Sequence, residues 1–587
     1  MGENDAPASD TDAASQSDVK NSKKGGSRAT LFIYLAMGLG NIGFVANMTS
    51  MVLYFYFVMH FDLLASATTT TNYLGSVFML TLVGGFISDT YMNRLNTFLC
   101  FAVLELLGYV LMIIQSHYKK LQPEPCTNES RCVKGGEALM LYTSMCLLAI
   151  GAGGVRGSAP ALGADQFDRK NPTERKYLAR FFNWLLLSVT IGATIGVTIV
   201  VWVSMNKGWD KGFLIGMLCA FAGFIVIASG KPFYRIRVPG DSALSSIFQV
   251  LVVMVKNRNE KLRDNTNELY EIQDKESGLS DEVQIPHTEQ FRLLDKAAIL
   301  RIGVKPKKWG VCTVTQVEEV KILTRMTPII ISTVIMNTCL AQMQTVSVQQ
   351  GTIMNTYIGS FEVPSASIPV IPLVFMSILI PIYEFAFVPL IRKVTGHPNG
   401  ITHLQRVGVG LVLSVISMGI AGVVEVKRKH ELLNNGHRIS VFWLGIQYAI
   451  FGIADMFTLV GLMDFFYTEA PAGMRSLSTS FSLLSLSFGY FLSSIFVQVT
   501  NSVTGKITKS KRGWLEGRDM NKNHVELFYW FLAVLSVLNF LNYLYWAKWY
   551  NYKKDDQVMK PEKSLRGISD QSEEIPSTID ETVAMIQ

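Results

Sequence analysis

Gly-Gly-Phe-Ile-Ser-Asp-Thr-Tyr-Met-Asn-Arg fills residues 84–94, at the end of an apolar run long enough to cross a bilayer. A glycine pair is followed by an acid and, five positions later, by a base. Gly84 and Gly85 let two helices approach closely, while Asp89 and Arg94 lie where water and the ends of partner helices meet them. The stretch therefore predicts a tight cytoplasmic hairpin between two membrane-spanning helices.

The composition of the chain points to a membrane protein. Of its 587 residues, 49% are hydrophobic and only 17% are charged, whereas soluble domains average about 25% charged residues. The charges gather in both tails, in a central stretch and in short loops. Long apolar runs lie between them, and these favour lipid as the surrounding solvent.

About twelve of these runs reach the ~20 residues that span the hydrocarbon core. Unpaired peptide groups are costly in lipid, so only helices or closed barrels cross it. The runs are unbroken rather than alternating, which excludes a barrel and predicts helices. They lie at roughly 30–57, 72–90, 95–115, 138–158, 181–203, 212–230, 322–343, 366–391, 404–425, 440–466, 475–499 and 526–549.

The amino terminus is expected inside, because Lys and Arg concentrate on the cytoplasmic side of membrane proteins. The first 28 residues are polar, so no cleavable signal peptide is expected. An even number of helices places the carboxyl terminus inside as well. The expected outer loops at 427–438 and 506–512 are also basic, which argues the other way. The basic residues before the first run are Lys20, Lys23, Lys24 and Arg28.

Polar segments divide the chain into five parts. Its two ends are expected to be disordered cytoplasmic tails, because they are too polar to bury a core. The central stretch is expected to be a cytoplasmic loop with an amphipathic helix at residues 316–321. It separates two six-helix bundles, which suggests a cavity between them near the midplane. The parts are the tail 1–28, the first bundle 29–230, the loop 231–320, the second bundle 321–550 and the tail 551–587.

Two of the seven cysteines share the loop after the third run, which is expected outside. Between Cys126 and Cys132 lies Asn128-Glu129-Ser130, a glycan acceptor pattern. An oxidising compartment permits a disulfide between the two cysteines. Two interpretations stay open: a disulfide with a glycan on Asn128, or two free thiols and an unused acceptor.

Several ordered motifs resemble a known family. Gly-Ala-Asp-Gln-Phe-Asp at 163–168 and Arg-Phe-Phe-Asn-Trp at 180–184 look like the signature after the fourth helix of the proton-coupled oligopeptide transporters. With further segments, the chain over about residues 27–552 resembles the plant nitrate and peptide transporter family of the major facilitator superfamily. The further segments are Phe-Tyr-Arg at 233–235, Ser-Val-Gln-Gln at 347–350, Ile-Gly-Ser-Phe-Glu-Val-Pro at 358–364 and Phe-Phe-Tyr-Thr-Glu-Ala-Pro at 465–471.

The resemblance implies an all-α membrane protein with the major facilitator fold, in which twelve transmembrane helices form two six-helix bundles. It implies a transporter rather than an enzyme. Residues 424–431 and 439–444 are similar to the branch that includes abscisic-acid and nitrate importers. We therefore expect a multi-pass protein of the plasma membrane that carries a small anionic solute, an abscisic acid-like organic acid or nitrate. Gibberellin, a dipeptide or a specialised metabolite is the alternative substrate.

The first helix departs from the family pattern of two glutamates followed by a base, which couples proton entry to transport. The matching positions hold Met37, Gly40 and Asn41. These side chains cannot exchange protons as a carboxylate pair beside a cation does. Glu105 or Asp455 could replace the missing acids, or the protein is an uncoupled uniporter or exporter.

Arg156 is the first candidate for substrate binding, where the family usually has lysine. A cation inside a membrane helix needs a cavity or a partner, and a guanidinium offers a planar fork to a carboxylate or nitrate. Asp455 in the tenth helix is expected to face it and to help close the cavity. The alternative for both residues is structural hydrogen bonding.

Two further positions bear on the substrate. Leu340 stands where a nitrate-transporting relative has a histidine, and Tyr448 is one of several aromatic candidates for the cavity wall. One cation among apolar side chains suits an organic acid better than a small hydrated anion, whose dehydration needs several donors.

By the same resemblance, Gly84, Gly85, Asp89 and Arg94 form a cytoplasmic gate that holds one conformation. Thr97 matches a position that is phosphorylated in a related nitrate transporter. A phosphate there would add about two negative charges beside Arg94. Without the resemblance, Thr97 is an ordinary threonine at a helix start.

No pattern in the sequence indicates a metal site, a phosphate-binding loop or a nucleophile triad, and the eight histidines are scattered. We expect no cofactor and no nucleic-acid partner. The expected partners are an anionic small molecule, the lipid bilayer and, if coupling survives, protons. Two functions from different classes remain: a carrier that alternates access, and a ligand sensor or degenerate carrier without net flux.

Overall fold

The structure, a computed structural model, describes most of the chain. The chain divides into two units, residues 1–548 and 549–587, and the helices lie in the first, except for the final residue of the last helix. The described residues are 24–126, 130–167, 172–236, 243–260, 269–270, 285–300, 309–395, 401–469, 478–508, 511–517 and 519–550.

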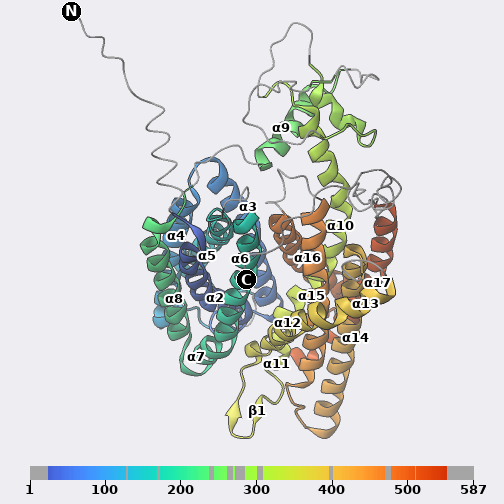
Figure 1. The fold of residues 1–587 in the computed structure, drawn as a ribbon. Helices are drawn as coiled ribbons and strands as arrows, with labels where there is room; N and C mark the ends of the chain where they lie inside the picture. Colours follow the sequence, from blue (N-terminus) through green and yellow to red (C-terminus); the bar gives the residue numbers. More distant parts are fainter. Residues whose placement is uncertain are drawn as a thin grey trace, which may run out of the picture. The chain divides into compact units, whose positions relative to one another are not determined.

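The first half of the chain forms one group of long helices, coloured blue to green in Figure 1. Within it, α5 packs against both α3 and α4, and α2 packs against α6 and α8. A π-helical segment interrupts the fifth expected span, which therefore consists of three consecutive pieces. The bounds are α2 (Gly26–Phe57), α3 (Leu63–Thr90), α4 (Arg94–His117), α5 (Gly135–Ala164), α6 (Pro172–Ile195), η2 (Gly196–Val200), α7 (Val201–Lys207) and α8 (Trp209–Ser229).

The second half forms another group, coloured yellow-green to red. Here α14 packs against α15, α10 packs against α16, and α12 packs against α15. The bounds are α10 (Val314–Gln344), α11 (Val346–Gly351), α12 (Val370–Ile382), η7 (Tyr383–Phe387), α13 (Val388–Thr395), α14 (His403–Asn435), α15 (Trp443–Glu469), α16 (Ser478–Ile507) and α17 (Val525–Trp549).

Short elements complete the chain. Between the halves lie α9 (Ala243–Lys256) and η5 (Arg292–Ala298), and a small antiparallel hairpin pairs β1 (Tyr357–Ile358) with β2 (Phe361–Glu362). The single 3₁₀ turns are η1 (Lys119–Leu121), η3 (Lys231–Phe233), η6 (Ser365–Ser367) and η9 (Met520–Lys522).

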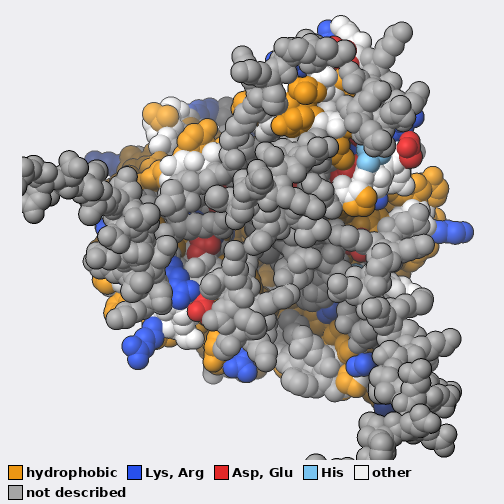
Figure 2. All heavy atoms as spheres, turned by 45° about the horizontal axis from the view of Figure 1, so that its top comes forward, with side chains coloured by type: hydrophobic (Ala, Val, Ile, Leu, Met, Phe, Trp, Pro, Cys, Tyr) orange, Lys and Arg blue, Asp and Glu red, His pale blue; other side chains and the backbone are white. Residues whose placement is uncertain are grey.

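These helices confirm the predicted all-α membrane fold. In the described part of the chain, ten helical stretches are long and apolar enough to cross a membrane. The other two expected runs, 366–391 and 440–466, coincide with α12 to α13 and with α15, which contain shorter apolar helices. Large apolar side chains stay exposed on many helices, and Figure 2 shows hydrophobic side chains at the surface among charged ones. Lipid is the solvent that such helices require.

The segment 316–321 is helical, as expected from the sequence. It forms the beginning of α10, which Thr313 starts with a capping box. With 31 residues, α10 measures about 46 Å, longer than the roughly 30 Å hydrocarbon core. Its first turns therefore extend beyond the lipid, beside α9 (Figure 1).

The two glycines at 84 and 85 differ in how closely α5 approaches them. A Cβ atom on Gly84 would lie only 2.6 Å from the Cα of Gly154 on α5, whereas a Cβ on Gly85 would meet its nearest atom at 3.8 Å. Gly84 is therefore required for the close approach of α3 to α5, and Gly85 is not.

Among the described residues, three hydrogen bonds connect the two halves. Ser487 Oγ donates to the Gly75 carbonyl at 2.7 Å, and Ser367 Oγ donates to the Val197 carbonyl at 2.8 Å. Gln349 on α11 donates to the carbonyl of Leu63, the first residue of α3, at 3.4 Å. With the predicted topology, the Leu63 and Val197 contacts lie toward the outer side of the membrane and the Gly75 contact lies deeper.

Candidate functional site

A small cavity lies inside the first half, between α2, α4, α5 and α8. Its volume is about 30 Å³, which is room for one or two water molecules. We expected a cavity between the two bundles, but no residue of the second half lines this one. The lining residues are Ala36, Met37, Gly40, Asn41, Phe98, Ala102, Glu105, Ala152, Val155, Arg156, Ala220 and Gly223.

Arg156 projects from α5 into this cavity. One guanidinium nitrogen, Nη2, donates to Asn41 Oδ1 at 2.8 Å, and the guanidinium carbon lies 3.5 Å from the ring centroid of Phe44. A cation over an aromatic face is attracted by the ring quadrupole. The group has five N–H donors, and the contact with Asn41 is its one hydrogen bond among the described residues. No carboxylate of the described chain lies within 4.0 Å of it.

Met37, Gly40 and Asn41, the positions where the resemblance led us to expect charged residues, all line the cavity. Asn41 is held in place because its Nδ2 donates to the Met37 carbonyl at 2.8 Å, which leaves Oδ1 to orient Arg156. A Cβ atom on Gly40 would meet no atom within 4 Å. Gly40 therefore leaves open space on the α2 side of the cavity that Arg156 also lines.

Glu105 enters the same cavity from α4. It is only 7% exposed, and no hydrogen bond or ion pair of its carboxyl group is found in the described residues. Its backbone is pressed against α5, since a Cβ on Gly151 would lie 2.3 Å from the Glu105 nitrogen. The sequence singled out Glu105 as a substitute acid, and the structure places it in the same cavity as Arg156.

Asp455, Leu340 and Tyr448 belong to the second half and do not line the cavity. The half-buried Asp455 makes no described ion pair with Arg156, so the structure does not bring this expected gate together. Tyr448 is buried, and its hydroxyl donates to the Met343 carbonyl. Leu340 lies on α10 and is half-buried.

The hairpin between α3 and α4 forms a polar cluster around Arg94. Its guanidinium contacts Asp89 Oδ1 at 2.9 Å and Asp165 Oδ1 at 2.5 Å, and it donates to the Ala161 carbonyl at 2.9 Å. Arg94 therefore ties the α3–α4 hairpin to the carboxyl end of α5. The sequence indicated Asp89 and Arg94 but not Asp165, which lies in the motif at 163–168.

The structure describes Thr97 and the cysteine pair but not the candidate glycosylation site. Thr97 is fully buried and donates to the Asn93 carbonyl at 3.1 Å, so phosphorylation would require the first turn of α4 to open. Cys126 and Cys132 are joined by a disulfide. Asn128 lies outside the described residues.

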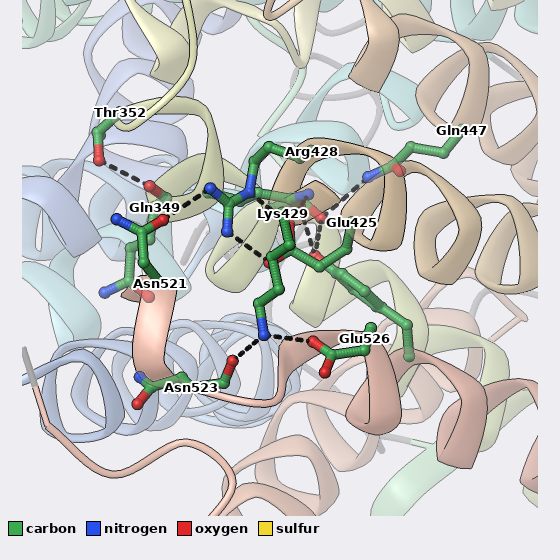
Figure 3. Close-up of polar contacts among 12 residues, drawn as sticks. Gln349, Thr352, Glu425, Arg428, Lys429, Gln447, Asn521, Asn523 and Glu526 are labelled. Atoms are coloured by element: carbon green, nitrogen blue, oxygen red, sulfur yellow. Dashed lines mark hydrogen bonds and ion pairs between the residues drawn. The ribbon is translucent and has the colours of Figure 1, made fainter. Parts of the chain in front are cut away.

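A second polar centre, which we did not predict from the sequence, lies in the second half and is shown in Figure 3. The Glu425 carboxylate accepts from Arg428 Nε and Nη2, both at 2.8 Å, and from Gln350 Nε2 at 2.6 Å. Arg428 also donates to Asn521 at 2.8 Å. Gln350 follows Gln349, the residue that contacts the first half, so this centre supports α11 where the halves meet.

One cluster has the spacing of a metal site. Ligand atoms of His287, Asp295 and Glu318 lie within 4.8 Å of one another. However, Lys321 Nζ lies 2.7 Å from both Asp295 Oδ1 and Glu318 Oε1 and donates to the Thr288 carbonyl. The ammonium group supplies the positive charge, so the cluster links the central stretch to α10 as an ion-paired joint.

Comparisons with known proteins identify the family. A family model described as "PTR2: POT family" matches residues 95–515. The Arabidopsis thaliana protein NRT1/PTR FAMILY 4.6 is 39% identical over 558 residues, which cover 90% of this chain and 95% of that protein. NRT1/PTR FAMILY 4.5 from the same plant is 41% identical over 531 residues, covering 87% and 91%.

Solved structures show the same fold at low identity. An auto-inhibited POT family peptide transporter superposes with a TM-score of 0.67 at 15% identity, covering 90% of this chain and 98% of the other. A POT family transporter in complex with 5-aminolevulinic acid gives 0.61 at 13% identity, covering 90% and 98%. The fold is therefore of the major facilitator type. The NRT1/PTR relatives and the family model point to carriers, not enzymes. The chain belongs to the POT family of multi-pass membrane transporters, alongside the NRT1/PTR proteins of plants.

Proposed function

We propose that this transporter moves a small organic anion across the membrane by alternating access, and that Arg156 binds the carboxylate of that anion. The family supports transport as the activity. The proposal about the substrate rests on one observation: the guanidinium in the first half has open space beside it and no ion pair in the described residues.

Arg156 has the properties of a binding residue rather than of a purely structural one. A guanidinium within a membrane helix is stable only beside a partner or a water-filled cavity. Its contacts, an amide oxygen and an aromatic ring, carry no negative charge. An incoming carboxylate would supply the charge that the site lacks, with bidentate geometry.

The surroundings favour an organic acid over nitrate. At about 30 Å³, the cavity takes only an anionic head, so the apolar remainder of the ligand must lie outside it. Nitrate would need several donors to replace its water, whereas Arg156 is the single cation that lines the cavity. A POT family transporter of the same fold was solved in complex with 5-aminolevulinic acid, which supports a small organic acid as the substrate.

The branch resemblance adds an abscisic acid-like substrate and a plasma-membrane location to this proposal. Nitrate, gibberellin, a dipeptide and specialised metabolites are the competing substrates. A flux screen over these compounds, in oocytes expressing the full chain, separates them. If the compound with the highest uptake had no carboxylate or other anionic group, the proposed role of Arg156 would be overturned.

The decisive variant is Arg156→Ala, with Arg438→Ala as the matched control, because Arg438 is exposed in the described structure. We expect Arg156→Ala to lose more than about tenfold of anion uptake, since a charge-assisted contact is worth roughly 1.5–3 kcal/mol. Arg438→Ala should transport like the wild type. Surface amounts of both variants are measured, and unchanged uptake by Arg156→Ala would remove this residue from the site.

The second candidate function is a ligand sensor without flux. It is favoured by the neutral side chains Met37, Gly40 and Asn41 where coupling acids are expected. A sensor would show ligand-dependent thermal stabilisation but no uptake of any compound in the screen. Measurable uptake that depends on Arg156 rejects it.

A further inference from the structure

Of the described residues, only two with ionisable side chains line the cavity, and these have opposite charge. Glu105 comes from α4 and Arg156 from α5. The remaining lining side chains are neutral, including all those that α2 contributes. Any proton that binds within this cavity therefore binds to Glu105.

The two charged groups share the cavity without forming an ion pair. Arg156 is directed to Asn41 and Phe44 instead, and no described partner contacts the Glu105 carboxyl group. An ionised carboxylate without partners is far more costly in a buried site than the neutral acid. The described arrangement thus favours the protonated form of Glu105. If the Arg156 side chain turned toward α4, the two groups could pair and the ionised form of Glu105 would be favoured.

We propose that Glu105 is the proton-binding group of this transporter. The substrate anion and the Glu105 carboxylate pair with Arg156 in turn during the transport cycle. In the loaded carrier, the substrate anion pairs with the guanidinium and a proton taken from water sits on Glu105. In the empty carrier, the proton and the anion have left together, and the Glu105 carboxylate pairs with Arg156. This inference rests on the proposed function, because it requires an anion at Arg156.

The charges balance in both states. One guanidinium is compensated by the bound anion in the loaded state and by Glu105 in the empty state. One proton therefore accompanies each monovalent anion, and the cycle moves no net charge. An electroneutral, pH-dependent flux distinguishes this scheme from an uncoupled carrier, whose flux of anions would carry current.

The other titratable groups near Glu105 do not compete for this proton. Tyr73 from α3 and Tyr109 from α4 interact with it, and Cys219 from α8 interacts with Tyr109. Phenols and thiols are neutral at physiological pH, with ordinary pKa values of about 10 and 8.5. From the second half, Asp455 does not line the cavity and interacts with Tyr490. In the part of the chain that the structure describes, Glu105 is thus the one acid that shares a cavity with Arg156.

The test uses the full chain in liposomes, with radiolabelled abscisic acid and nitrate as probes. Uptake is measured with the outside one pH unit below the inside and again at equal pH, and leak into Arg156→Ala liposomes is subtracted. For the wild type we expect up to about tenfold more uptake with the gradient, the limit for one proton per transport step. Glu105→Gln should lose this stimulation while exchange of the probe at equal pH remains measurable.

Two variants control for structural effects. Glu124→Gln makes the same chemical change at an exposed outer position and should keep the full response to the gradient. Gly40→Glu combined with Glu105→Gln returns a carboxylate to the cavity, where a Cβ meets no atom within 4 Å, and should restore the response. A purely structural Glu105 would not be rescued from another helix.

The outcomes separate this inference from the proposed function. If wild-type uptake does not exceed that of Arg156→Ala, the proposed function fails and the inference fails with it. If the wild type transports and Glu105→Gln keeps its response to the gradient, only the inference is overturned. The same holds if Asp455→Asn abolishes the response while Glu105→Gln leaves it intact.

Discussion

The buried Glu425–Arg428 pair provides the sharpest stability prediction. Glu425 is fully buried and Arg428 is 2% exposed. Replacing Arg428 by Met removes two of the three described hydrogen bonds of the Glu425 carboxylate and leaves only Gln350. A buried charge that loses its partner costs about 3–5 kcal/mol. The shape of the long side chain is largely kept, so this cost is mainly electrostatic.

Thermal unfolding in detergent measures this cost. A large chain shifts by roughly 2 °C per kcal/mol, so Arg428→Met should lower the Tm by about 6–10 °C. Lys429→Met is the matched control on the next residue. Lys429 and its partner Glu526 are each 15% exposed, and a pair near solvent contributes only about 1 kcal/mol. This control should shift the Tm by about 2 °C.

A double variant tests the cause. Glu425→Gln with Arg428→Met removes both charges, and it should be less destabilised than the sum of the single variants because no unpaired ion remains. Additive losses, or an Arg428→Met shift no larger than that of Lys429→Met, would refute the argument. Gln350 follows the contact of Gln349 with Leu63, so a weaker centre should also loosen the joint between the halves.

Two further predictions concern packing and thiol chemistry. Gly84→Ala places a Cβ 2.6 Å from the Gly154 Cα, so it should destabilise the fold by about 1–3 kcal/mol. Gly85→Ala is the control and should leave the Tm nearly unchanged. Equal shifts of the Tm in the two variants would contradict the close approach of α3 and α5. Burial raises the pKa of Cys312 to about 11, although a hydrogen bond with Gln249 opposes the rise. The thiolate is the nucleophile in maleimide labelling. In a variant that keeps Cys312 as its one free cysteine, labelling should therefore be slow at neutral pH and should accelerate as the pH rises toward the pKa of about 11. The denatured chain should label quickly. Fast labelling of the folded protein at neutral pH would contradict the burial.

The sequence was sufficient to predict the helices, because length and apolarity alone identify membrane spans. Each of the twelve expected runs coincides with a helix or with consecutive helices. The motif at 84–94 also placed Asp89 and Arg94 correctly in one cluster. These features depend on residues close together in sequence, where helix geometry fixes the spacing.

The site could be predicted only in part, because an apolar helix in lipid gives no signal for its rotation about its own axis. Arg156 and Glu105 were recognisable as charges in apolar runs, but nothing in the sequence paired them with each other rather than with Asp455. For the same reason, the contact between Arg94 and Asp165 could not be predicted from the sequence. Partners on different helices are fixed by packing, which depends on small residues whose contacts a single sequence does not reveal.

That packing explains why a carboxylate from α4 can serve a cation on α5. Gly151 has no side chain, and the backbone of Glu105 occupies the space where its Cβ would be. Gly154, one turn later on α5, similarly accepts the ring of Phe101. α4 is thereby drawn against α5, and the acid reaches the open space that Gly40 leaves on α2. A transporter that lacks acids on its first helix needs another carboxylate in the cavity with Arg156 if anion and proton are to travel together, and the α4–α5 contact places Glu105 there.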